Sequence, residues 1–247
     1  MKTINTSTHK RNAIITGAFF IAATVTAIIG VLLYNPILMD TEYLKTGVIN
    51  SNQILLGALF ETILAISAVG TAIMMYPYLK QFNESWGLGY VCFRVLEVIF
   101  ILIGLLSMIS IVTLSQHYVS STESDMTSFQ TAATILKTIH RWTFVYGPHL
   151  MLGVNTFIYS SIFFQSKLVP KRLSVLGMTG ALLIFIAAIL ELFGVISPFG
   201  SEIILMALPI ALYEMILAGW LITKGFTVEA IVTIPEFKVH EGSISAA

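Results

Sequence analysis

Apolar residues in this chain gather in long unbroken runs, and polar residues lie mainly between the runs. A helix needs about 20 apolar residues to cross about 30 Å of hydrocarbon, because backbone groups in lipid must be satisfied within the segment. Unlike strands, the runs do not alternate between polar and apolar positions. The pattern predicts an all-α, polytopic integral membrane protein that is a bundle of six transmembrane helices. The runs are Ala13–Tyr34, Gln53–Tyr76, Gly87–Leu114, Trp142–Phe164, Leu173–Ile196 and Ile203–Thr223.

The connections between the runs are too short to hold a second domain. The longest, Ser115–Arg141, contains the stretch Phe129–Lys137, which is either a short interfacial helix or an early extension of the fourth run. The first run is long for a signal peptide and lacks a clear cleavage site, so we expect it to be retained. The predicted organisation is a cytoplasmic segment over residues 1–12, a transmembrane domain over 13–224 and a flexible cytoplasmic tail over 225–247.

Basic residues set the expected orientation, because Lys and Arg are enriched on the cytoplasmic side of membrane proteins. If both termini are cytoplasmic, the other side receives only Lys45, Lys137 and Arg141 of the 13 basic residues, and Arg94 lies inside a run. The tryptophans also fall at predicted interfaces. The nine basic residues on the cytoplasmic side are Lys2, Lys10, Arg11, Lys80, Lys167, Lys171, Arg172, Lys224 and Lys238.

The amino-acid composition indicates which kinds of partner this chain is suited to bind. Hydrophobic residues make up 56% of the chain and charged residues only 11%, against roughly a quarter charged in an average soluble domain. Lys and Arg together number 13, as do Asp and Glu, so the chain has no net positive charge that would favour binding to nucleic acid. The lipid bilayer is the expected partner. Cys92, the single cysteine, is expected to pack as a small apolar side chain. No Gly-rich phosphate loop, nucleophile elbow or H-E-x-x-H motif occurs, so no cofactor or metal is predicted.

Six ionisable residues lie inside the runs, where each costs several kcal/mol unless it faces protein or water. Glu61, Glu191 and Glu214 sit on stripes of small residues at helical spacing, and such stripes let helices approach closely. The expected topology separates the six into two depths. Glu61, His149 and Glu191 fall in the outer half, whereas Arg94, Glu97 and Glu214 fall nearer the middle or the cytoplasmic half.

Arg94 and Glu97 are three residues apart and so share a helix face, which predicts a local ion pair. Glu214 is a second candidate partner for the same guanidinium. This buried charge network is either a clamp that locks helices together or part of a transport path or proton relay. A catalytic site and a ligand pocket are further alternatives.

The outer-half residues offer plausible metal ligands but no metal-binding spacing. Tyr146–His149 contains Pro148, which breaks the helical hydrogen-bond ladder next to a histidine. Glu61, His149 and Glu191 have suitable ligand types, yet a lone histidine in a span is more often a hydrogen-bonded packing residue. Asn155 and Pro209 are interpreted as hydrogen-bond and kink residues.

Several segments together resemble a family of bacterial membrane proteins known as domain of unknown function 4386. The resemblance places Glu61, Arg94, Glu97 and Glu214 within family patterns but does not extend to His140 or His149. It implies a multi-helix protein of the bacterial inner (plasma) membrane and supplies no activity. The segments that carry it are Gln53–Glu61, Leu88–Glu97 with its Phe-Arg-x-x-Glu element, Thr113–Gln116, Ser166–Ser174 and Leu208–Met215.

The sequence therefore leaves the biochemical function open among three classes. The leading hypothesis is a small transporter or binding protein whose small-molecule ligand or proton meets the buried Arg and Glu network. An intramembrane enzyme would need water or a metal beside a carboxylate. A non-catalytic membrane subunit would act through a protein partner and need neither.

Overall fold

The computed structural model of the protein describes residues 6–197 and 200–227, and the regular secondary structure in these ranges is helical. Short helices or turns connect the long helices. The elements are α1 (Thr6–Leu33), α2 (Asn35–Leu38), α3 (Tyr43–Ile49), α4 (Ser51–Leu79), α5 (Glu84–Ser120), α6 (Glu123–Phe144), the π-helix η1 (Val145–Met151), α7 (Leu152–Ser166), α8 (Lys171–Leu192) and α9 (Ser201–Thr223).

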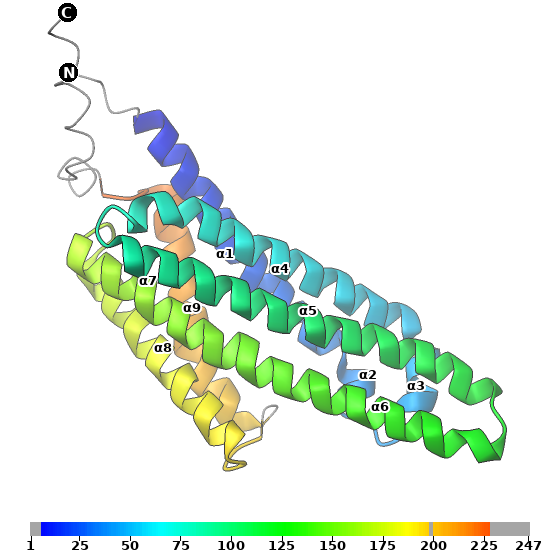
Figure 1. Cartoon of the computed structure of the whole chain (residues 1–247). Coiled ribbons are helices and arrows are strands. Elements are labelled where there is room, and N and C mark those ends of the chain that lie inside the picture. Colours follow the sequence, from blue (N-terminus) through cyan, green and yellow to red (C-terminus); the bar gives the residue numbers. More distant parts are fainter. Residues whose placement is uncertain (1–5, 198–199, 228–247) are drawn as a thin grey trace, which may run out of the picture.

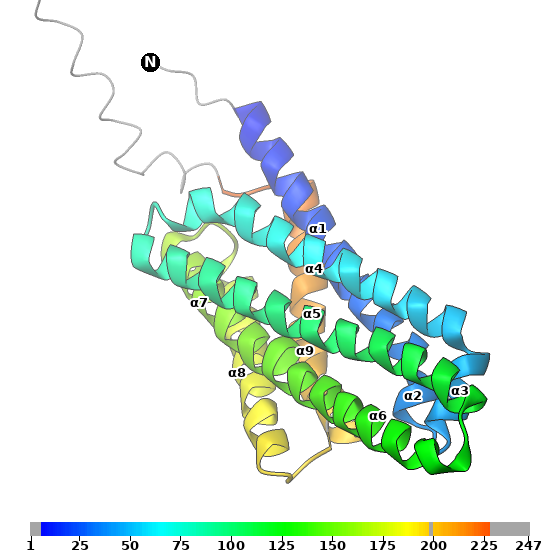
Figure 2. The same ribbon diagram turned by 45° about the vertical axis from the view of Figure 1, so that its right-hand side comes forward.

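The long helices form a ring in which each packs against its neighbours in the sequence (Figure 1). Helix α1 packs on α4, α4 on α5, α5 on α6 and α7, and α7 on α8. Helix α8 packs on α9, and α9 packs back on α1, which closes the ring. The same arrangement is visible after a 45° turn (Figure 2). The predicted fold class, an all-α bundle of apolar helices, is confirmed.

Five helices of the described chain are long and apolar enough to cross a membrane: α1, α4, α5, α8 and α9. The remaining predicted span, Trp142–Phe164, is divided among α6, η1 and α7, which follow one another without a break. Pro148 lacks a backbone N–H and its ring crowds the preceding turn. The turn widens here, so that the Leu152 N–H donates to the Gly147 carbonyl five residues earlier.

Helices α5 and α6 extend past the ring at the end opposite the N-terminus (Figure 1). The 37 residues of α5 span about 55 Å at 1.5 Å per residue, well beyond about 30 Å of hydrocarbon. Phe129–Lys137 lies within α6, so the interpretation as an early extension of the fourth run is correct. Tyr43 of α3 and Phe129 of α6 pack with Tyr118 of α5, and this contact joins the projecting ends to the short helices α2 and α3.

The small-residue stripes of α4 and α8 face the interior as predicted, whereas on α9 Glu214 and Ala218 are buried and Ala207 and Ala211 are only half-buried. Gly57, Glu61, Ala65, Ala68 and Ala72 of α4 are all buried, and so are Gly177, Ala181, Ala188 and Glu191 of α8. Close approach of helix backbones matters here because association within lipid depends on packing more than on the hydrophobic effect. Cys92 differs from its prediction, because it is exposed on the outer surface of the ring.

Both described ends of the chain meet at one end of the bundle. Nδ1 of His9 lies 3.0 Å from the Tyr78 hydroxyl, and the Phe226 ring packs on Tyr78 with centroids 4.4 Å apart. Helix α1 begins before the expected boundary at residue 13, and Phe226 is buried, so the boundary expected at residue 225 falls within packed structure. The rest of the expected tail, residues 228–247, lies outside the described residues.

Candidate functional site

The predicted ion pair between Arg94 and Glu97 lies in the middle of the ring. Both side chains come from the buried face of α5, and Nη1 of Arg94 lies 2.9 Å from Oε2 of Glu97. Arg94 is only 2% exposed and Glu97 only 4% exposed. A guanidinium this deep needs such a partner, because an unpaired charge in the bilayer is costly.

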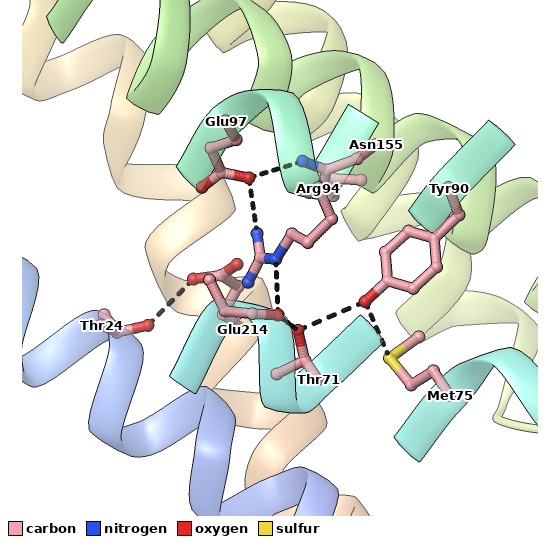
Figure 3. Close-up of polar contacts among 10 residues, drawn as sticks. Thr24, Thr71, Met75, Tyr90, Arg94, Glu97, Asn155 and Glu214 are labelled. Atoms are coloured by element: carbon pink, nitrogen blue, oxygen red, sulfur yellow. Dashed lines mark hydrogen bonds and ion pairs between the residues drawn. The ribbon is translucent and has the colours of Figure 1, made fainter. Parts of the chain in front are cut away.

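Two further helices hold this pair in place (Figure 3). Asn155 of α7 donates from Nδ2 to Oε2 of Glu97 at 2.6 Å, and Nε of Arg94 donates to the Ala68 carbonyl of α4 at 3.4 Å. The interpretation of Asn155 as a hydrogen-bond residue is confirmed. The Asn155 amide and the Arg94 guanidinium donate to the same oxygen of Glu97.

Glu214 of α9 faces the same cluster but has a different partner. The Thr24 hydroxyl of α1 donates to Oε2 of Glu214 at 2.9 Å (Figure 3). Among the described residues no ion pair within 4.0 Å joins Glu214 to Arg94, although the two charges interact electrostatically. Of the two candidate partners predicted for Arg94, the structure therefore places only Glu97 in direct contact.

Three polar atoms of the cluster have unused hydrogen-bonding capacity. Arg94 Nη2, Glu97 Oε1 and Glu214 Oε1 make no hydrogen bond within the described part of the chain. They are also absent from the set of fully enclosed polar atoms, so each retains surface that a water-sized molecule can touch. The cluster is thus deeply buried but not sealed.

An aromatic layer lies beside the cluster, mostly on the side toward the described chain ends. Tyr90 is one helical turn from Arg94 on α5, and its ring meets that of Tyr159 at 5.4 Å. Tyr159 also stacks on Tyr213 at 6.0 Å and meets Phe20 at 6.1 Å. All four rings are fully buried. Tyr90, Tyr159 and Phe20 lie about one turn from Arg94, Asn155 and Thr24 toward the end of the bundle where both described chain ends lie, whereas Tyr213 lies at the level of Glu214.

The structure does not assemble the three outer-half candidates into one site. Tyr34 of α1 donates to Oε2 of Glu61 at 3.0 Å, whereas His149 of η1 lies 2.6 Å from Glu191 of α8 through Nδ1 and Oε2. No group of three His, Cys, Asp or Glu side chains within residues 6–197 and 200–227 is arranged to hold a metal ion. The hypothesis of a shared Glu61, His149 and Glu191 metal site is therefore wrong in its geometry.

The two predicted depths are nevertheless distinct. On α4, Glu61 precedes Ala68, the residue bonded to Arg94, by seven residues, or about 10 Å along the helix. On the helical run through η1 and α7, His149 precedes Asn155 by six residues, or about 9 Å. Both outer pairs thus lie roughly two turns away from the central cluster, on its side opposite the aromatic layer.

Sequence reasoning missed three residues of these polar clusters. Thr24 and Tyr34 are polar positions in the first run whose partners are carboxylates on other helices. His140 was placed in a connection, yet it is 2% exposed, and its Nδ1 lies 3.2 Å from the Gly104 carbonyl. The spacing of Ala133, His140 and Phe144 on one face of α6 was the available signal.

Outside the spans, Asp40 shows an ordinary loop environment. The Thr46 hydroxyl and the Glu42 backbone N–H donate to its carboxylate and lower the pKa of Asp40. Its carboxylate therefore stays ionised to lower pH than that of a free aspartate. Lys137 lies 4.5 Å from the centre of the Tyr43 ring nearby, and partial burial lowers its pKa.

Fold and composition together define a helical membrane protein that crosses the bilayer several times. The chain matches the model of the family described as "Domain of unknown function (DUF4386)" over residues 15–225, and it belongs to that family. This span includes every residue of the central cluster. No curated protein and no solved structure matches the chain.

Proposed function

We propose that this protein is a small transporter or ligand-binding membrane protein whose Arg94, Glu97 and Glu214 cluster binds a proton or a small cation. The observation that carries the proposal is the charge imbalance of the cluster. One guanidinium faces two carboxylates, and its direct ion pair is with Glu97. Glu214 has only a neutral hydroxyl as its hydrogen-bond partner among the described residues.

An uncompensated carboxylate in a low-dielectric interior is unfavourable by several kcal/mol. Binding of a proton or a small cation at Glu214 removes this excess charge. The free Oε1 atoms of Glu97 and Glu214 retain surface that a water-sized molecule can touch, so both oxygens are suited to hold the bound species. The buried rings of Tyr90, Tyr159 and Phe20 support a role in transport, because they cover the Arg94 and Glu97 part of the cluster on the side toward the described chain ends.

The first test is an infrared difference titration of the purified protein against pH and against added Na⁺. We expect the wild-type protein to show a carboxyl band that changes with one of these ligands, and Glu214→Gln to remove that band. Glu202→Gln is the matched control, because Glu202 is an exposed carboxylate in the first turn of the same helix. A band that persists in Glu214→Gln would contradict the proposal.

A flux measurement then distinguishes transport from simple binding. The protein is reconstituted into liposomes that contain a pH-sensitive dye, with and without a Na⁺ gradient. A transporter moves the ligand that the infrared titration identifies, and Glu214→Gln abolishes this movement while Glu202→Gln retains it. Binding without flux would leave only the ligand-binding form of the proposal.

We further propose that the chain resides in the bacterial plasma membrane with both termini in the cytoplasm. The basic residues Lys10, Arg11, Lys80, Lys167, Lys171, Arg172 and Lys224 lie at or beside the helix ends that meet where the two described chain ends lie. Such enrichment is typical of the cytoplasmic side.

Cysteine labelling of intact cells tests this orientation. In a Cys92→Ala background, Lys10→Cys and Lys224→Cys should both be protected from an impermeant maleimide until the cells are opened, whereas Thr41→Cys should react at once. All three positions are exposed on the protein. Labelling of Lys10→Cys and Lys224→Cys in intact cells would reverse the orientation, and labelling of only one of them would mean that a span is miscounted.

A further inference from the structure

The pair of His149 and Glu191 has the geometry of an oriented base. Nδ1 of His149 and Oε2 of Glu191 are 2.6 Å apart, and the Glu191 side chain is completely buried. A carboxylate bonded to one imidazole nitrogen fixes the tautomer that carries its proton there, and it leaves the other nitrogen with a free lone pair. Nδ1–H therefore donates to Glu191, and Nε2 is the acceptor.

Two observations indicate that this nitrogen is open to a ligand. Oε1 of Glu191 is fully enclosed and has no hydrogen-bond donor, so the imidazole is the group available in the described structure to balance this carboxylate. Nε2 of His149 also lacks a hydrogen bond, but it is not among the enclosed atoms and retains surface that a water-sized molecule can touch. A π-helix turn carries this histidine, and such turns are frequent at functional sites.

The surroundings give His149 few competing charges. On α8 the facing group is Glu191. On α5 the backbone carbonyl of Glu97 lies beside Gly147 of the same π-helix, and the Glu97 carboxylate is paired with Arg94. On α6 the titratable group is His140, whose ring also packs against Phe144, and on η1 itself it is Tyr146, whose ring packs on Phe100. Along α7 the nearest titratable side chain is Tyr159, ten residues away, or about 15 Å.

We propose that His149 and Glu191 form a proton-exchange site in the outer half of the bundle. Nε2 takes a proton from a hydronium ion that reaches it: one O–H bond of the hydronium breaks and leaves water, a new N–H bond forms at Nε2, and the hydrogen bond from Nδ1–H to Glu191 stays intact. The dyad changes from a neutral imidazole beside a carboxylate to an ion pair without net charge. The idea that this site is a stage on a proton path toward the central cluster rests on the proposed function. Proton binding by His149 and Glu191 does not depend on it.

The direct test is nitrogen NMR of the full-length protein in detergent micelles, with ¹⁵N in the histidine rings. The chain has five histidines, and a His149→Gln variant assigns the signal of interest. In neutral buffer we expect a protonated Nδ1 and a bare Nε2. On acidification within the folded range, the Nε2 signal should move to the protonated position while Nδ1 stays protonated. In Glu191→Gln, this fixed tautomer should be lost.

A bare Nδ1, or an Nε2 signal that never changes over the folded range, would overturn the proposal. Proton flux into liposomes supplies the second readout, with His117→Gln as the control because His117 is an exposed histidine near the end of α5. If Glu214→Gln removes the carboxyl band but His149 fails its NMR test, the proposed central site is supported and the proposed proton-exchange site is contradicted. If the NMR of His149 is as expected and the carboxyl band persists in Glu214→Gln, the proton-exchange site is supported and the proposed central site is contradicted.

Discussion

Arg94→Ala is expected to lower the free energy of unfolding by about 3–5 kcal/mol, the cost of breaking a buried ion pair by removing one partner. The substitution leaves the Glu97 carboxylate with only the Asn155 amide as a hydrogen-bond partner in the described structure. It also removes the charge that acts on Glu214. Both carboxylates then lie inside the ring without a cation.

The measurement is thermal or denaturant unfolding of the detergent-purified protein. Lys80→Ala is the control, since Lys80 is an exposed basic residue just after α4 that makes no ion pair within the described residues. Equal stability of the two variants would show that Arg94 does not clamp the helices. A double variant with Arg94→Ala and Glu97→Gln should recover part of the loss, because it removes one of the stranded charges.

Gly180→Ala is expected to destabilise the bundle by about 1–3 kcal/mol, the usual cost of overpacking a core. A Cβ atom at Gly180 would lie 2.8 Å from the Ile210 backbone nitrogen and 2.9 Å from its Cα. These are backbone atoms of α9, so a side-chain rotation cannot relieve the clash. Helices α8 and α9 would have to move apart, and Glu214 lies one turn beyond Ile210 on the displaced helix.

Gly219→Ala provides the matched comparison on the same helix pair. A Cβ atom at Gly219 meets nothing within 4 Å, so alanine there should leave stability unchanged or raise it through its better helix propensity. Unfolding temperatures of the two purified variants report the difference. A Gly180→Ala protein as stable as Gly219→Ala would mean that the contact of α8 with α9 is looser than the structure shows.

The sequence was sufficient to predict the helical fold class and the ion pair between Arg94 and Glu97, which are close together in the sequence. Run length determines which segments span a bilayer, and the three-residue spacing of Arg94 and Glu97 already places both on one face of a single helix. The small-residue stripes also identified the buried faces of α4 and α8 correctly, because packing in lipid requires close backbones.

Contacts between helices could not be predicted in this way. Glu61, His149 and Glu191 all lie on one side of the central cluster along the bundle, but a shared level does not determine which neighbours a residue meets around the ring. Glu61 points toward α1, whereas Glu191 points toward η1. His140 was missed because it precedes the fourth apolar run in the sequence, whereas in the structure its helix packs on Gly104 of α5 and its ring meets Tyr34 of α1.

The location of both partners of the central ion pair on one helix has a consequence for biosynthesis. Arg94 and Glu97 are able to neutralise each other as soon as α5 leaves the translocon, before any other helix packs against it. Asn155 arrives later with α7, and Glu214 arrives with α9, the helix that closes the ring against α1. The excess negative charge therefore enters the membrane with the final span, when Thr24 on α1 is already in place to receive it.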